Sequence, residues 1–245
     1  MMAELSKPKS VAKSFLTQKE SVNMSDVLSP EKKLTPVTTL VAVMDQYSET
    51  PAQSPISDSQ KKGIVQPATR QSGVVIKELA LMGHLIIRGN ADNEVFVEGV
   101  TNVLGLALPT KPLTTAANDV TSILWLSPDE WLVLSSADML YDIEVALREK
   151  LTGHFSIVNQ SGGQTVIELT GLNVVEVLKK STSLDVHPNS FPVGKVAGSL
   201  LAKSSATFYH CGENQWRLIV RRSFADYIWR WLIDASKEFG LTIEK

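Results

Sequence analysis

The sequence predicts an α+β protein made of two tandem split-βαβ (ferredoxin-like) repeats that pack as one domain, preceded by a mostly disordered N-terminal extension. Two pairs of landmarks indicate the repeats. Tryptophans in predicted hairpins, Trp131 and Trp216, lie 85 residues apart, and strand-ending glycines, Gly89 and Gly171, lie 82 residues apart. A third observation, the change in composition near residue 77, separates the extension from the domain.

The predicted extension covers residues 1–77. It contains six of the eleven prolines of the chain, many Ser, Thr and Lys residues, and no tryptophan. Such a composition buries too little apolar surface to offset the entropy of ordering, so we expect disorder in isolation. Residues 38–47, TTLVAVMDQY, are apolar enough for a short helix or a docking segment. The extension is therefore either a flexible tail or an arm that wraps a partner.

The first repeat is predicted to span about residues 78–160 of the domain, which covers 78–245. Apolar residues recur first at strand and then at helical spacing. The expected elements are a strand, a helix, a hairpin, a second helix and a closing strand, at residues 79–89, 91–105, 124–134, 136–153 and 154–160. Within the hairpin, LWLSPDEWLVL, Pro128 and Asp129 favour a turn between two tryptophan-bearing strands.

The second repeat is predicted to span about residues 161–245, with the same order of elements. These are a strand, a helix, a hairpin of two strands and a final helix, at residues 164–171, 172–181, 199–211, 215–221 and 223–240. Ser161–Gly163 is expected to be a hairpin turn between adjacent strands. Ser223 and Asp226 suggest a capping box for the final helix. Its predicted inward stripe is Phe224, Tyr227, Ile228, Trp231, Leu232, Ala235 and Phe239.

Composition and motifs exclude several classes of function. The formal net charge is −2 and no basic stripe is present, so nucleic-acid binding is not expected. Apolar runs are far shorter than the ~18 residues that span a bilayer, and no secretory signal is evident. The single cysteine, Cys211, forms no intrachain disulfide and is expected to be a buried structural thiol in a reducing, cytoplasmic setting. The four histidines lack zinc-site spacing, and nucleotide-binding and nucleophile motifs are absent.

Five residues are candidates for contact with a partner protein. Asp185, His187 and Phe191 lie in a proline-containing loop, STSLDVHPNSFPVG, and rigid loops with aromatic and polar residues often bind partners. Asp185 and His187 could pair and brace this loop. Arg221 and Arg222 precede the final helix, where they are placed either for an anionic partner or for solvent. No residue is predicted to be catalytic, to bind a cofactor or to ligate a metal.

Three blocks of sequence resemble one known family. LSPDEWLVL, LDVHPNSFPVG and RRSFADYIWRWL, in this order and spacing, are similar to the gamma subunit of heterotetrameric sarcosine oxidase. The resemblance runs from about Glu78 to Phe239. One departure is visible, because the family usually shows Lys-Gly-Cys-Pro before the second block, where this chain has Lys180 followed by Ser-Thr-Ser.

The resemblance implies a subunit without its own active site, in a complex with alpha and beta subunits and an expected delta subunit. That complex oxidises sarcosine to glycine and passes the one-carbon unit to tetrahydrofolate. FAD, FMN, NAD and the folate are implied to lie on the alpha and beta subunits, with no cofactor on this chain. The implied fold is similar to that of folate-binding aminomethyltransferases.

Two alternatives remain open at the level of sequence. The chain would be a stand-alone tetrahydrofolate-binding, aminomethyltransferase-like protein if the loop of Asp185 and His187 offered a carboxylate to a pterin ring. It would be a protein-binding module unconnected to flavin chemistry if its partner were of another kind.

Overall fold

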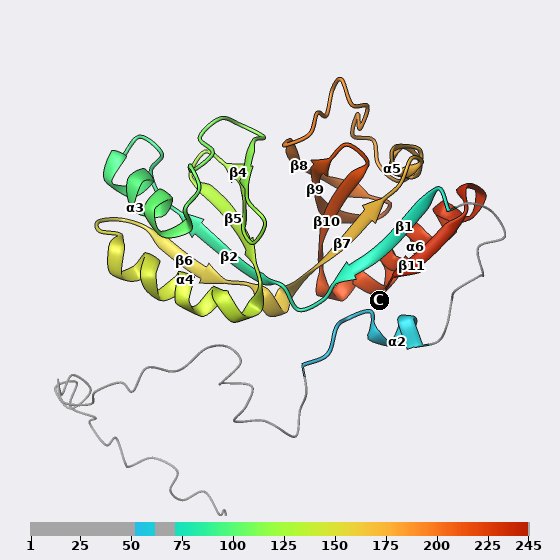
Figure 1. The fold of residues 1–245 in the computed structure, drawn as a ribbon, viewed down its shortest axis with the longest axis horizontal. Coiled ribbons are helices and arrows are strands. Elements are labelled where there is room, and N and C mark those ends of the chain that lie inside the picture. Colours follow the sequence, from blue (N-terminus) through green and yellow to red (C-terminus); the bar gives the residue numbers. More distant parts are fainter. Residues whose placement is uncertain (1–51, 62–71, 245) are drawn as a thin grey trace, which may run out of the picture. The chain divides into compact units, whose positions relative to one another are not determined.

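The computed structural model describes residues 52–61 and 72–244, which form an α+β fold with two sheets (Figure 1). This fold class was predicted. The α-helices are α2 Ser57–Lys61, α3 Glu94–Leu104, α4 Ala137–Lys150, α5 Val174–Ser181 and α6 Ala225–Ser236. The strands are β1 Val74–Leu79, β2 Gly83–Arg88, β3 Thr115–Ala117, β4 Ser122–Ser127, β5 Glu130–Ser135, β6 Ser156–Asn159, β7 Gln164–Thr170, β8 Val196–Leu201, β9 Ser204–Gly212, β10 Gln215–Arg221 and β11 Leu241–Glu244.

The five-stranded sheet has the order β3-β4-β5-β2-β6, and α3 and α4 contribute to the core on one of its faces (Figure 1). Its hairpin of β4 and β5 pairs Trp125 with Trp131, which confirms the predicted tryptophan hairpin. Trp131 is fully buried, its ring centroid lies 5.8 Å from that of Phe96 on α3, and its Nε1 donates to Pro109 O at 2.7 Å. The tryptophan therefore joins the sheet to its helix layer and to the loop before β3.

The six-stranded sheet has the order β11-β1-β7-β10-β9-β8. Helices α5 and α6 pack on it, and the core between them contains the fully buried Trp216. Trp131 and Trp216 thus both lie on helix-covered faces, as their spacing predicted. Strand β1 runs antiparallel to β7 and parallel to β11, so the first described strand lies inside the sheet of the second half.

A third apolar cluster contains residues from both sheets. Its buried members are Ile86, Leu124, Leu132, Leu134, Val166, Val196, Tyr209 and Ile219. The alternation along β2 explains the arrangement, because Leu85 and Ile87 join the helix-side core while Ile86 points to the other face. Both faces of the central strands are therefore buried.

Several predicted boundaries differ from the observed ones. Strand β1 begins at Val74, before the predicted domain boundary at residue 78. The strand predicted at 79–89 corresponds to β2, which begins later, at Gly83. Leu79 is the last residue of β1, and the chain turns at Leu81, which has φ +57°, before it enters the other sheet. The predicted hairpin turn at Ser161–Gly163 is wrong: this segment is a 3-10 turn that connects β6 and β7, which belong to different sheets.

The final helix also differs from its prediction. The capping box is wrong, because α6 has Phe224 as its N-cap and no side-chain capping bond. Asp226 instead accepts a hydrogen bond from Ser59 and pairs with Arg230. After Gly240 the chain continues as β11, which was not predicted.

Part of the predicted extension is ordered against the domain. Residues 52–61 pack on the six-stranded sheet, with Ile56 fully buried in its core. The short helix or docking segment predicted at 38–47 lies outside the described residues. So do 1–51 and 62–71 as a whole, where disorder was predicted.

Candidate partner-binding surface

The loop between α5 and β8 is anchored from below by Phe191. This side chain is 1% exposed, and its ring centroid lies 5.0 Å from that of Trp216. His210 lies against the same tryptophan, with parallel rings 4.3 Å apart, and its Nδ1 is 2.7 Å from Phe191 O. Phe191 is therefore a core residue that positions the loop, and its ring offers no surface to a partner.

The tip of this loop is held by bonds to its own backbone. Asp185 Oδ1 accepts from the His187 amide at 3.1 Å, and His187 Nδ1 accepts from the Asn189 amide at 3.2 Å. The pKa of Asp185 is lowered, first by a hydrogen bond from Ser190 and then by the His187 amide. The predicted brace is thus made through backbone amides and not by a bond between the Asp185 carboxylate and the His187 ring.

A second loop, which precedes β3, lies against the first. The Val196 amide donates to Leu113 O at 3.0 Å, and Thr115 Oγ1 donates to Gly194 O at 2.9 Å. Leu113 has φ +62°, an unfavourable conformation for a leucine, so the surrounding contacts hold it in place. The two halves of the chain therefore meet at these loops.

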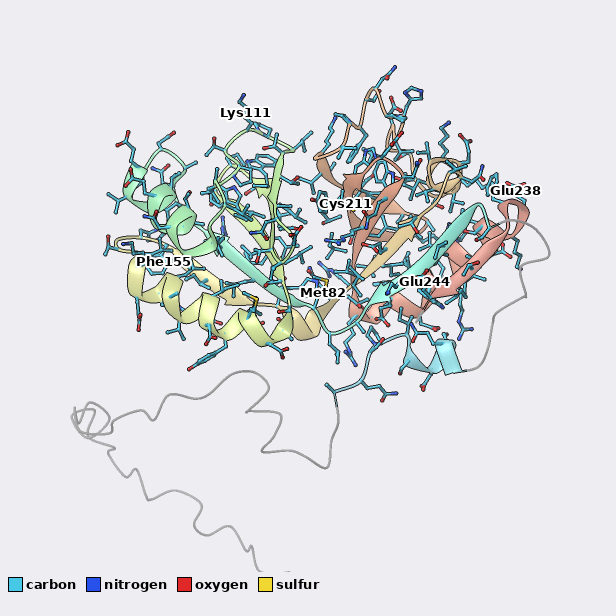
Figure 2. All side chains as sticks on the ribbon, viewed as in Figure 1. Met82, Lys111, Phe155, Cys211, Glu238 and Glu244 are labelled. Carbon is cyan, nitrogen blue, oxygen red and sulfur yellow. The ribbon has the colours of Figure 1, made fainter. Side chains whose placement is uncertain are left out.

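We call the exposed part of the two loops the two-loop surface. Leu113 and Val193 are 38% and 54% exposed. Its other exposed members include Lys111, Pro112, Asp185, His187, Pro188 and Pro192. Figure 2 shows the Lys111 side chain extending away from the sheet at the end of its loop. Exposed apolar groups on a preorganised loop, rimmed by charged residues, are typical of protein-binding surfaces.

The structure places the five predicted contact residues at separate locations. Asp185 and His187 lie on the two-loop surface, whereas Phe191 lies beneath it. Arg221 is exposed at the far end of β10, five residues beyond Trp216, which is about 17 Å at the usual rise of a strand. Next to it, Arg222 donates to Gln53 O at 3.0 Å. The arginines therefore do not share a site with the loop.

The described residues meet neither the requirements of a metal site nor those of a reactive cysteine. Across 52–61 and 72–244 no cluster of His, Cys, Asp and Glu has the arrangement of a metal site. Burial raises the pKa of the Cys211 thiol to about 11, so the thiol stays protonated near neutral pH, as expected of a structural cysteine. A polar pocket of about 420 Å³ lies beside this thiol, lined by Asn118, Asp119, Tyr209 and Arg217 among others. Arg217 is already paired with Glu168 at 2.9 Å.

No helix within the described ranges is long and apolar enough to cross a membrane.

Comparison with known proteins identifies close similarity to one family. Residues 88–238 match the family described as sarcosine oxidase, gamma subunit family. The sarcosine oxidase subunit gamma of Corynebacterium sp. (strain U-96) is 30% identical over 174 residues, which are 69% of this chain and 82% of that protein. The matched region contains the two-loop surface and both tryptophan hairpins.

Solved structures give the same result. A chain of the heterotetrameric sarcosine oxidase from Corynebacterium sp. U-96, in complex with pyrrole 2-carboxylate, aligns with a TM-score of 0.70 and 26% identity, covering 77% of this chain and 96% of that chain. The aminomethyltransferase T of the glycine cleavage system from Bartonella henselae aligns with a TM-score of 0.58 and 11% identity, covering 79% of this chain and 59% of that one. At that identity the second likeness concerns the fold alone.

Proposed function

Because the chain belongs to the sarcosine oxidase gamma subunit family, we propose that it is the non-catalytic gamma subunit of a heterotetrameric sarcosine oxidase. The observation that carries the proposal is the alignment with 96% of a chain from a solved heterotetrameric sarcosine oxidase. A chain that matches nearly the whole length of one component of an assembly is suited to the same place in a similar assembly.

The proposed complex oxidises sarcosine to glycine and transfers the released one-carbon unit to tetrahydrofolate. Alpha, beta and delta subunits are the proposed partners, and FAD, FMN, NAD and the folate are proposed to bind to the alpha and beta subunits. The role of this chain is then to support the flavin-bearing subunits, in the cytoplasm, with no nucleic acid or membrane involved. The family match, and the core position of both tryptophans and Phe191, support a structural role.

Co-expression tests this function directly. Expressed alone, the chain is expected to be colourless and without oxidase activity. Expressed with the alpha, beta and delta subunits of its own organism, it should co-purify as a yellow complex and raise the yield of sarcosine oxidase, measured by size-exclusion chromatography and peroxide release. A chain that purifies as a stable monomer and binds none of these subunits would contradict the proposal.

The two-loop surface is the proposed contact with a larger subunit, and Val193→Asp tests it. A carboxylate at this 54% exposed position should weaken assembly about tenfold or more, because a buried unpaired charge in an interface costs well over 1.4 kcal/mol. The dissociation constant of the complex is measured by titrating the chain against its partners.

Val158→Asp on β6 is the matched control, since Val158 is 45% exposed and lies on the edge strand of the five-stranded sheet. Both variants should unfold within about 0.5 kcal/mol of the wild type. Equal assembly of the two variants would show that the two-loop surface makes no contact.

A further inference from the structure

Residues 52–61 contact the six-stranded sheet through Ile56. This side chain is fully buried in the same cluster as Val74 and Ile76 of β1. Burial of this isoleucine favours docking of the segment on the sheet, because it removes the apolar side chain from water. Figure 1 shows α2 beside β1 and α6, on the side where this contact is made.

A buried carboxylate provides the second contact. Glu78 on β1 is 5% exposed and accepts from Thr165 Oγ1 at 2.8 Å, from Ser54 Oγ and from Gln60 Nε2 at 3.4 Å. Among the described residues it forms no salt bridge. Two of the three donors to Glu78 come from the segment 52–61. A buried polar group depends on its hydrogen bonds, so release of the segment would leave the carboxyl group of Glu78 with one donor among the described residues.

The segment is attached to the start of α6 in the same way, by side chains. Ser59 Oγ donates to Asp226, and Arg222 donates to Gln53 O at 3.0 Å. Within the described ranges, the backbone–backbone bonds of the segment stay inside it, from the Ser57 amide to Ser54 O and from the Gln60 amide to Ile56 O. Its release would therefore break no bond of the strand ladder.

We propose that residues 52–61 are a strap that docks on the six-stranded sheet and opens as a unit, with Ile56 as its apolar plug and Glu78 as its anchor. Opening exposes the core residues that Ile56 covers and removes two hydrogen-bond donors from Glu78. The ladders of β1 with β7 and β11 stay intact. The strap is a conformational device of this chain and does not depend on the proposed function.

Amide hydrogen exchange in the full-length chain tests the strap. The reporters are the Ser57 and Gln60 amides of the strap and the Ile76 amide of β1. In the wild type, the strap amides should be protected, and less so than Ile76. Ile56→Ser should speed their exchange about tenfold or more, because it removes the buried plug, and Ile76 should remain the better protected amide. Ser54→Ala should speed it by a smaller factor.

Gln53→Ala is the matched control, because it removes only the exposed bond from Gln53 Nε2 to Ser57 Oγ and keeps the main-chain acceptor of Arg222. It should leave the strap amides protected. Strap amides that exchange as fast in the wild type as in an unstructured peptide would overturn the proposal. So would strap exchange that is unchanged in Ile56→Ser, or wild-type strap amides as strongly protected as Ile76, since the strap would then open only when the sheet unfolds.

Discussion

Trp216→Ala is expected to lower the free energy of unfolding by about 3–5 kcal/mol, the range for truncating a large aromatic in a core. Trp216 is fully buried and contacts the rings of both His210 and Phe191. Its removal leaves a cavity between the sheet and the anchor of the loop that carries Asp185 and His187. Denaturation by urea, followed by circular dichroism, measures the change.

Trp231→Ala is the control for this variant. Trp231 lies on α6, is 37% exposed, and donates from Nε1 to Ser181 Oγ at 3.0 Å. Truncation should cost clearly less than Trp216→Ala, because more than a third of the side chain already lies in water and the lost hydrogen bond contributes about 1 kcal/mol. If the two variants lost similar stability, Trp216 would not be the centre of this core.

The hairpins were predictable because their information is local. In β4 and β5 the alternation of apolar residues, the turn residues and the two tryptophans lie within one stretch of chain, and the observed pairing of Trp125 with Trp131 follows from that pattern. The burial of Trp131 and Trp216 beneath helices was predicted from the spacing of the two hairpins. Both are buried under helices of their own half.

The final helix shows where local pattern is insufficient. Its predicted stripe included Phe224, Tyr227 and Trp231, all of which are more than a third exposed, and omitted Trp229, which is 1% exposed. Because α6 has tryptophans on two nearly opposite sides, Trp229 on one and Trp231 on the other, the aromatic residues alone do not decide which side faces the sheet. The choice is made by packing against strands distant in sequence.

The strand β1 was missed for a related reason. Its pairs are β7 and β11, more than 80 residues away, and no nearby turn marks it as part of a hairpin. The two-loop surface depends on contact between Leu113 and Val196, which no local motif encodes. Of its two loops, only the one between α5 and β8 was recognisable from the sequence, through its prolines and through Asp185 and His187. Arg221 and Arg222 were predicted to contact a partner because they precede a helix. Their distance from that loop is set by the length of β10, which the sequence pattern alone does not relate to the loop.

His84 is buried in a position that makes stability depend on pH. The side chain is fully buried, and its Nδ1 lies 3.0 Å from Met82 O, so the neutral ring carries its proton on Nδ1 and donates to this carbonyl. Nε2 is also buried, and it has no partner among the described residues. Desolvation lowers the pKa of His84 to about 4, partly opposed by the Met82 carbonyl, because a second proton would occupy a buried nitrogen without an acceptor.

Acidification from pH 7 to pH 4 is therefore expected to remove about 3 kcal/mol of stability through His84 alone. The unfolded chain binds a proton at this residue with a pKa near ~6.5, whereas the folded chain does so only near 4. The contribution is thus complete above pH 6.5 and is lost as the pH falls through this interval.

His84→Gln keeps a donor for Met82 O but does not titrate, so its free energy of unfolding should vary less with pH. His154→Gln, at an exposed position, should retain the wild-type slope. Equal slopes for His84→Gln and the wild type, in urea titrations between pH 4 and 7, would show that the His84 ring takes up its proton in the folded chain as readily as in the unfolded one.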